Sequence, residues 1–146
     1  YVGEAVKVDL ELLEALLGSG FIPVIGPLGL YSFDRPKGAP LSLNINGDTL
    51  AGEIAAAAGA ERLIFLTDVA GIFDHTGKLL SQLSPEEAEA LMASGVASEG
   101  MVVKLKACLR ALSNILTARI VDGRQSHALL REIEGVNEGT TIGVPK

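Results

Sequence analysis

The chain has 146 residues, of which 48% are hydrophobic and 21% are charged, and its formal net charge is −6. This length fits one domain or part of a larger one, and the apolar fraction is sufficient for a buried core. The negative charge argues against binding to nucleic acid or anionic membranes through bulk electrostatics, and the single cysteine, Cys108, excludes an internal disulfide or a metal site of several cysteines.

The first quarter of the chain predicts two strands around a helix. Residues 2–8 alternate loosely between apolar and polar side chains, as a strand would. Asp9 can cap the next helix, whose leucines share one face before glycines end it at residues 18–20. The apolar run 21–25 predicts a buried parallel strand, and the Pro- and Gly-rich residues 26–42 predict a loop, either a substrate lid or an insertion.

The stretch 43–52 passes from an extended run into a helix. Asn44, Asn46 and Asp48 alternate, so their side chains would share one face of an extended segment. Asp48 stands at the N-cap position of the following helix, which Gly59 ends. A polar row at a helix N-terminus suits an anionic small molecule; a loop with a capping aspartate is the simpler alternative.

The middle of the chain predicts a strand and two helices. Residues 62–67 read as a strand that runs into a turn at 68–73. Ser84-Pro85-Glu86-Glu87 has the pattern of a capping box with proline at the first helical position, so a helix begins there and ends near Gly95. Residues 97–100 open a further helix that extends to Leu112.

The last part of the chain completes an alternation of strands and helices. Residues 118–122 predict a strand, a helix follows from about Ser126, and residues 139–142 predict a short final strand. This order predicts an α/β fold, a three-layer α/β/α sandwich with a mostly parallel sheet. Ligands of such sheets bind at the carboxyl ends of the strands, where the turns after Thr67 and Asp122 lie.

Several familiar sites are absent from the sequence. Gly71 to Lys78 is not a Walker loop, because five residues separate its glycines and Leu79 replaces the required Ser or Thr. A dinucleotide fingerprint is also missing. His75 and His127 are not near a nucleophile elbow and are more simply surface or packing residues. Cys108 lies on the apolar face of its helix and reads as a core thiol.

Lys104 lies one turn into the helix that opens near Gly100. A lysine at that place is unfavourable beside the positive helix end unless it meets an anion. An exposed lysine beside a glycine turn is the alternative. No apolar run reaches the roughly 18 residues of a membrane span, and no basic-then-apolar signal segment opens the chain, so we expect a cytoplasmic, reduced setting.

Four separated motifs resemble the acetylglutamate kinases of the amino acid kinase family. They are Asn44-Ile45-Asn46-Gly47-Asp48-Thr49-Leu50-Ala51, Leu66-Thr67-Asp68-Val69-Ala70-Gly71-Ile72, Gly95 through Lys104, and Val121-Asp122-Gly123-Arg124 with His127 through Leu130. Gly139-Thr140 extends the resemblance almost to the C-terminus. The order and spacing of these motifs make the resemblance specific.

The resemblance implies ATP- and Mg²⁺-dependent phosphorylation of the side-chain carboxylate of N-acetyl-L-glutamate, in arginine biosynthesis. Asp48 and Lys104 would be catalytic, Asp48 by organising lysines and Lys104 by neutralising the phosphoryl group. Asn44 and Asn46 would bind the substrate. The nucleotide would be held by Thr67, Asp68, Val69, Ala70, Gly71, Ile72, Phe73, Val96, Ser98, Gly100 and Met101. No residue is assigned to a metal.

The resemblance starts within the family's pattern, so we expect a C-terminal portion of a longer enzyme that does not turn over alone. Residues 1–49 would be the tail of the substrate-binding lobe and residues 50–146 the nucleotide-binding lobe. The insertion at 33–37 and the shortened segment 135–139 depart from the family, and feedback inhibition by arginine cannot be read from the chain.

Two alternatives stay open. Kinases that act on carrier-protein-bound aminoadipate or glutamate in lysine biosynthesis are related, but they carry Thr-Asp-Gly-Asp and Ser-Asn-Val-Pro-Gly in place of these motifs. A non-catalytic nucleotide-binding module is the second alternative. Family members are commonly dimers or hexamers, so we expect a homo-oligomer or an otherwise self-associating chain.

Overall fold

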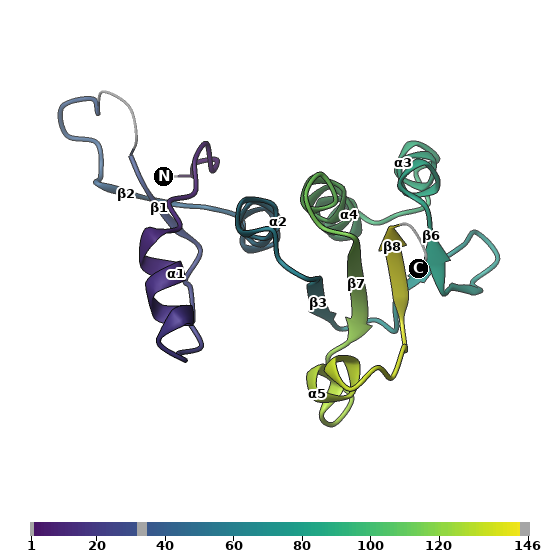
Figure 1. Cartoon of the computed structure of the whole chain (residues 1–146). Coiled ribbons are helices and arrows are strands. Elements are labelled where there is room, and N and C mark those ends of the chain that lie inside the picture. Colours follow the sequence, from purple (N-terminus) through teal and green to yellow (C-terminus); the bar gives the residue numbers. More distant parts are fainter. Residues whose placement is uncertain (1, 32–34, 144–146) are drawn as a thin grey trace.

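The main sheet of the protein is formed by strands between residues 63 and 143 (Figure 1). The computed structural model describes residues 2–31 and 35–143, and within them this sheet has four strands in the order β3-β7-β8-β6. Their bounds are β3 (Leu63–Thr67), β7 (Thr117–Asp122), β8 (Thr140–Gly143) and β6 (Gln82–Leu83). The β3–β7 and β6–β8 pairs are parallel and β7–β8 is antiparallel. The predicted mostly parallel sheet is therefore confirmed.

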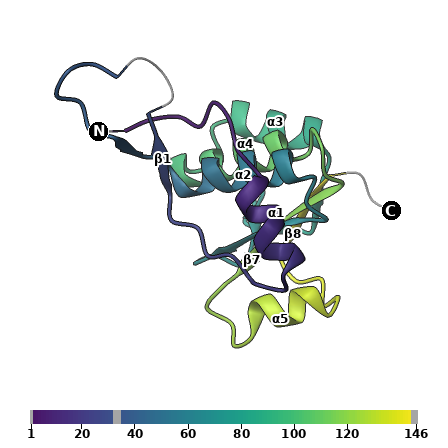
Figure 2. The same ribbon diagram turned by 60° about the vertical axis from the view of Figure 1, so that its left-hand side comes forward.

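Helices cover both faces of this sheet. Figures 1 and 2 show a layer of helices above the sheet and another helix below it. The upper layer contains α2 (Gly47–Ala58), α3 (Pro85–Ala93) and α4 (Glu99–Ala111), and the lower helix is α5 (Ala128–Ile133). The predicted three-layer α/β/α arrangement is thus observed.

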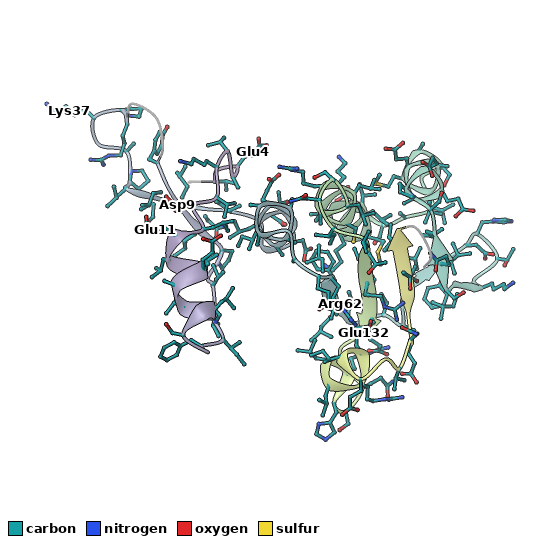
Figure 3. All side chains as sticks on the ribbon, viewed as in Figure 1. Glu4, Asp9, Glu11, Lys37, Arg62 and Glu132 are labelled. Carbon is teal, nitrogen blue, oxygen red and sulfur yellow. The ribbon has the colours of Figure 1, made fainter. Side chains whose placement is uncertain are left out.

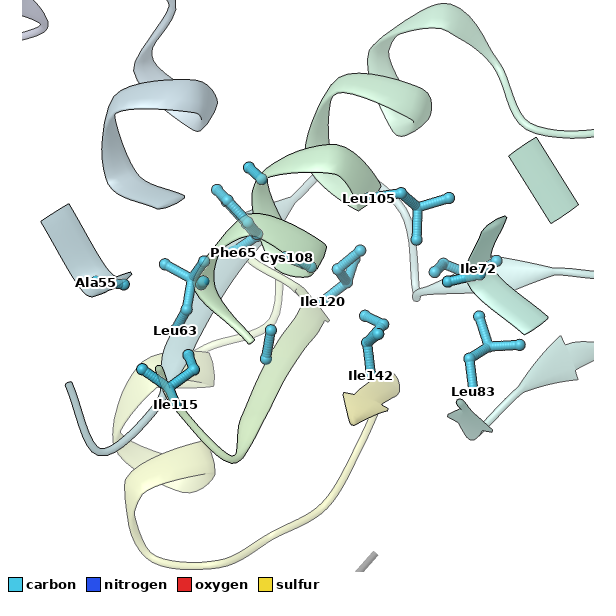
Figure 4. Packing of buried hydrophobic residues seen from close by; sticks show 14 residues of the cluster. Ala55, Leu63, Phe65, Ile72, Leu83, Leu105, Cys108, Ile115, Ile120 and Ile142 are labelled. Atoms are coloured by element: carbon cyan, nitrogen blue, oxygen red, sulfur yellow. The ribbon is translucent and has the colours of Figure 1, made fainter. Parts of the chain in front are cut away.

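The hydrophobic core fills the space between α4 and the sheet (Figure 4). Leu105 and Cys108 of α4 and Ile120 and Ile142 of the sheet are completely buried. Removing a side chain of the size of Leu from water contributes about 2 kcal/mol. The sequence prediction that Cys108 is a core thiol is confirmed.

The other face of β7 is held to α5 by a buried ion pair. Arg119 donates through Nε to Glu132 Oε1 over 2.7 Å and through Nη2 to Oε2 over 2.9 Å, and the side chains are only 5% and 3% exposed. Arg119 also donates to the carbonyl of Glu138 over 2.6 Å. Arg62, the residue before β3, donates through Nη1 to the carbonyl of Glu132 (Figure 3). These bonds fix α5 under the sheet.

The ends of the central helices agree with their local sequence signals. Ser84 Oγ accepts from the Glu87 amide, and Glu87 Oε2 accepts from the Ser84 amide over 2.7 Å, which confirms the capping box of α3. Gly59 ends α2 in the left-handed conformation with φ of 55°. The side chain of Ser98 caps α4.

The N-terminal segment forms an arm beside α2 (Figure 2). It contains α1 (Glu11–Gly18) and the antiparallel pair β1 (Leu28–Leu30) and β2 (Ser42–Asn44). Leu10, not Asp9, is the N-cap residue of α1 and has no side-chain cap; Asp9 Oδ1 accepts from the amide of Glu11 over 3.1 Å from one residue earlier. Every residue of α1 is at least partly exposed, so its apolar positions contribute little to the core.

Several expectations for this arm were wrong. Residues 21–25 form no strand, and Ile22 and Val24 are 90% and 97% exposed, because no neighbouring strand lies beside them in the part of the chain that the structure describes. Residues 2–8 contribute only a bridge from Val2 to Asn44. The predicted loop 26–42 begins with β1 and ends with β2. Of the insertion at 33–37, Phe33 and Asp34 lie outside the described residues.

Three details in the rest of the chain also differ from prediction. The final strand, β8, extends from Thr140 to Gly143, and α5 begins at Ala128 rather than near Ser126. The turn after β3 leads into an unpredicted hairpin of β4 (Ile72–Phe73) and β5 (Leu79–Leu80). Among the described residues, no helix has both the length and the apolar character needed to cross a membrane.

Candidate functional site

The N-terminus of α2 is built by Asn46 and leaves Asp48 available. Asn46 has extended φ and ψ of −61° and 128°, and its Oδ1 accepts from the Thr49 amide over 3.0 Å. Asp48 was predicted as the N-cap, and this is wrong: it lies in the first turn of the helix. Because Asn46 already caps α2, the Asp48 carboxylate can face another element.

That other element is α4. Lys104 Nζ donates to Asp48 Oδ2 over 2.7 Å, and the two side chains are 23% and 27% exposed. The Lys104 ammonium also lies 6.0 Å from the centre of the Phe65 ring, within the range of a cation–π interaction. The anion that the sequence required for Lys104 is therefore the carboxylate of Asp48, and water still reaches both groups.

A second ion pair joins the same two helices farther from their N-termini. Arg110 Nε donates to Glu53 Oε1 over 2.9 Å. Its bond to Glu53 raises the pKa of Arg110. Asn114 adds a hydrogen bond from its amide to the carbonyl of Ala56 over 2.8 Å. These contacts add to the packing of α2 against α4 beyond the Asp48–Lys104 pair.

The loop after β3 is tied to the end of β7. Thr67 Oγ1 lies 2.8 Å from the carbonyl oxygen of Val69 and 3.2 Å from that of Val121, so its hydrogen is donated to one of them. The Gly123 amide donates to the carbonyl of Thr67 over 2.8 Å. Because β3 and β7 are parallel and pair Thr67 with Asp122, both loops leave by the same edge of the sheet.

The rest of this loop is held by β8. The amide of Ile72 donates to Thr140 Oγ1 over 2.8 Å, and that hydroxyl donates to the carbonyl of Leu80 over 2.6 Å. Gly71 lies directly against Thr140 with φ of 149°, where an added Cβ would come within 2.7 Å of the hydroxyl. A side chain at position 71 would therefore displace the loop.

The second predicted nucleotide segment is the link from α3 to α4. Val96 is exposed, Ser98 Oγ accepts from the Met101 amide, and Met101 is half-buried against the core. An added Cβ on Gly100 would meet open space. Each of α2 and α4 precedes a strand of the parallel pair β3–β7 and runs antiparallel to it. Both helices therefore begin near the carboxyl ends of these strands, so this segment lies at the same edge of the sheet as Asp48.

The predicted substrate residues do not form one polar row. Asn44 ends β2 with its side chain exposed, and Asn46 uses its side-chain oxygen to cap α2. The helix begins at Gly47, so Asp48 no longer follows the alternation of an extended run. The expected shared face of Asn44, Asn46 and Asp48 is therefore wrong, although all three lie around the start of α2.

Asp122 and Arg124 form a charged pair at this edge, beyond the residues that the resemblance assigns to the site. Arg124 Nη2 donates to Asp122 Oδ2 over 2.8 Å. The Arg124 hydrogen bonds hold the pKa of Asp122 well below its usual range. The sequence signal was available, because Asp122 ends a predicted strand and Gly123 and Arg124 follow it directly. The described residues contain no group of three or more His, Cys, Asp or Glu side chains that could hold a metal ion.

Comparison with known sequences gives a consistent result. The model of the family described as the amino acid kinase family matches residues 1–122. The acetylglutamate kinase of Dehalococcoides mccartyi (strain CBDB1) is 47% identical over 142 residues, which cover 97% of this chain and 52% of that protein. The acetylglutamate kinase of Acidiphilium cryptum (strain JF-5) is 48% identical over 134 residues, covering 91% and 43%. The chain spans about half the length of the curated relatives it matches.

A solved structure shows the same arrangement of elements. The crystal structure of N-acetylglutamate synthase from Neisseria gonorrhoeae, complexed with coenzyme A and L-arginine, superposes with a TM-score of 0.83. It is 28% identical, and the match covers 98% of this chain and 32% of that chain. The agreement includes the N-terminal arm, because almost the whole chain is covered.

Proposed function

The chain belongs to the amino acid kinase family, and on that premise we propose that it is a C-terminal portion of an acetylglutamate kinase that includes the nucleotide-binding lobe. Such an enzyme moves the γ-phosphoryl group of ATP to the side-chain carboxylate of N-acetyl-L-glutamate. The bond from the γ-phosphorus to the β–γ bridging oxygen breaks, a bond to a carboxylate oxygen forms, and ADP leaves. The acyl phosphate then serves arginine biosynthesis. The Asp48–Lys104 pair, 2.7 Å long at the edge of the sheet, carries this proposal.

Lys104 is suited to the charge that develops in this reaction. The transferred phosphoryl group spreads negative charge over its equatorial oxygens, and the protein accelerates the reaction mainly by positioning and by cationic stabilisation. Lys104 is partly exposed and lies one turn into α4. The Lys104 ammonium can therefore bind the phosphoryl oxygens while α4 stays in place.

Asp48 would hold Lys104 in place and would not itself attack the γ-phosphorus. A lysine side chain has several rotatable bonds, and a carboxylate at hydrogen-bond distance restricts where its ammonium lies. Asp48 also lies in the first turn of α2, where a negative side chain is favourable. In this assignment Asp48 is a positioning group that organises cations around the reacting phosphate.

The nucleotide itself would lie along the two loop segments at this edge. The turn from Thr67 to Phe73 would form its floor, and Val96, Ser98, Gly100 and Met101 would form the other side. The fixed backbone of the turn and the free space beside Gly100 support this placement. Mg²⁺ would arrive with the nucleotide, because the ion is commonly bound through substrate phosphates with several of its waters retained.

The remaining assignments follow from the same proposal. Residues 1–49 would be the tail of the substrate-binding lobe and residues 50–146 the nucleotide-binding lobe. Asn44 and Asn46 would contact N-acetyl-L-glutamate from the start of α2. A cytoplasmic location fits a biosynthetic kinase that uses ATP.

Self-association is also part of the proposal. A cavity of about 420 Å³ separates residues 23–27 from α2 and β3, and its lining is apolar, from Pro23 and Ile25 on one side to Leu50, Ile54 and Leu63 on the other. β3 is an edge strand of the main sheet, and exposed edges and large apolar patches favour association. Light scattering on the purified chain would test this, and a monomer at high concentration would count against it.

A fused enzyme tests the proposed activity. The part of the Dehalococcoides mccartyi enzyme that this chain does not match is joined to the 146 residues, and acyl phosphate is trapped as the hydroxamate. We expect Mg-ATP-dependent turnover with N-acetyl-L-glutamate. A fused protein that folds but gives no product, while the parent enzyme is active, would contradict the proposal.

The same assay separates the two alternatives. A kinase for carrier-bound aminoadipate would be slow with free N-acetyl-L-glutamate and fast with the loaded carrier protein. Arg35 and Lys37 are the candidate cations near the substrate side for an acidic carrier. A non-catalytic module would bind Mg-ATP without product in either assay.

A further inference from the structure

Gly52 lies where α2 comes close to the backbone of α4. It is buried, and a Cβ added to it would lie 2.6 Å from the carbonyl oxygen of Ala107 and 3.0 Å from its Cα. Real Cβ atoms do not come so close to other atoms. The obstructing atoms belong to backbone, so a rotamer change cannot relieve the contact. Only glycine allows the two helices to lie at this distance.

This contact lies one helical turn from the Asp48–Lys104 pair on both helices. Gly52 follows Asp48 by four residues on α2, and Ala107 follows Lys104 by three residues on α4. Residues at these spacings lie above one another on the same face of a helix. The distance between the backbones at Gly52 therefore sets how far the Asp48 carboxylate is from the Lys104 ammonium.

We propose that Gly52 is a positioning residue for the phosphoryl-transfer site, because the absence of its side chain brings Asp48 within 2.7 Å of Lys104. This inference rests on the proposed function for its catalytic meaning. A methyl group at position 52 moves α2 away from α4. Lys104 then loses its fixed partner while its own helix, and the core beneath it, stay in place.

The geometric part is tested on the 146-residue chain without any kinase assay. Lysines are labelled with limiting acetic anhydride, and mass spectrometry gives the rate for Lys104 relative to Lys106, an exposed lysine of the same helix. We expect a low ratio in the wild-type chain, because Lys104 is paired and largely covered. Gly52→Ala should raise the ratio at least threefold, about as far as Asp48→Asn does.

Two combined variants separate a change of spacing from a general loosening. Gly52→Ala with Asp48→Asn should label Lys104 no faster than Asp48→Asn alone, because both act through one pair. Gly52→Ala with Asp48→Glu should restore the low ratio, because the longer acid spans the wider gap. If the longer acid does not restore the ratio, the effect is not one of spacing and the inference is overturned.

Matched controls identify effects of folding. Gly18→Ala adds the same methyl group to α1, where nothing lies within 4 Å, and should leave the ratio unchanged. Ala111→Val overpacks another buried position of α4 and should lower stability without releasing Lys104. If Gly52→Ala does not fold, Ala107→Val adds bulk at the residue whose backbone Gly52 faces and should raise the ratio in the same way.

Kinetics in the fused enzyme then test the catalytic meaning. Gly52→Ala should lower kcat about tenfold with little change in the KM for ATP, because the nucleotide loops are not moved. An unchanged labelling ratio in both Gly52→Ala and Ala107→Val overturns the inference even if the kinase is active. If Gly52→Ala releases Lys104 but the fused enzyme with Gly52 intact has no kinase activity, the geometric part is correct and the proposed function is refuted.

Discussion

Asp48 and Lys104 are 56 residues apart in the sequence and 2.7 Å apart in the structure. Their helices both begin at the carboxyl edge of the sheet, so the fold itself brings the two charges together. Glu53 and Arg110 form a second ion pair, at 2.9 Å, between the same helices. The protein thus contains one pair at the proposed site and a closely matched pair away from it.

Asp48→Asn in the fused enzyme should lower kcat by about 100-fold, within the range seen when one electrostatic group of an active site is removed. The amide keeps the size of the side chain but holds the Lys104 ammonium less firmly. Turnover is measured as ADP release. The control is Glu53→Gln, which removes the matched pair from the same helices and should change kcat less than twofold. Wild-type turnover in Asp48→Asn would remove Asp48 from the mechanism.

Lys104→Met should be more severe, with kcat lowered by about 1,000-fold, because the cation itself is lost from the developing phosphoryl charge. Lys104→Arg should recover part of the rate, since the charge stays but its geometry changes. Lys106→Met is the control on the same helix, because Lys106 is exposed to solvent. Equal rates for the Lys104 and Lys106 variants would contradict the assignment.

Glu132→Gln should destabilise the chain by about 3–5 kcal/mol, because it leaves the buried Arg119 guanidinium without its counter-charge. Urea unfolding followed by circular dichroism gives the free energy of unfolding. Glu61→Gln breaks the exposed pair with Arg62 and should cost less than about 1 kcal/mol. Similar losses for the two variants would show that the Arg119–Glu132 pair is not buried in solution.

Cys108 should make the folded chain less stable at alkaline pH. Burial raises the pKa of its thiol to about 12, whereas the pKa of a cysteine in an unfolded chain is about 8.5. Above the unfolded pKa the unfolded state loses a proton that the folded state keeps, so the free energy of unfolding falls as pH rises, by up to about 1.4 kcal/mol per pH unit.

The difference between the wild-type chain and Cys108→Ala isolates this contribution. The variant costs packing at every pH, but its stability should decline less steeply between pH 9 and pH 11, a range chosen between the two pKa values at about 8.5 and about 12. Parallel stability curves for the two proteins would mean that the thiol is accessible to water.

The part of the fold from α2 onward could be predicted because its signals are local. The capping box at Ser84, the left-handed Gly59 and the apolar strands around Phe65 and Ile120 each depend on neighbouring residues and on burial against the sheet. The antiparallel β8 was not foreseen as such, because strand direction depends on the path of the whole connection. The small β4–β5 hairpin was missed because each strand has only two residues.

The N-terminal arm could not be predicted from its own pattern. The run from Phe21 to Ile25 has the composition of a buried strand, but a strand needs a partner with free backbone groups, and in the described residues none lies beside it. Asp48 was assigned as N-cap because the sequence alone did not show that Asn46 would adopt the cap geometry. The pairing of Asp48 with Lys104 was anticipated in two parts: Lys104 needed an anion, and the resemblance implied that Asp48 organises lysines.

The most direct measurement is a titration of the ¹⁵N-labelled 146-residue chain with Mg-ATP, followed by NMR chemical shifts. Saturable shifts at Thr67 to Phe73 and Val96 to Met101, with a smaller shift at Lys104, are expected if these loops hold the nucleotide. Millimolar affinity, about 4 kcal/mol, is sufficient for detection. A folded chain with no saturable shifts, or with shifts confined to α5 and residues 134–139, would contradict the assignment of residues 50–146 as the nucleotide-binding lobe.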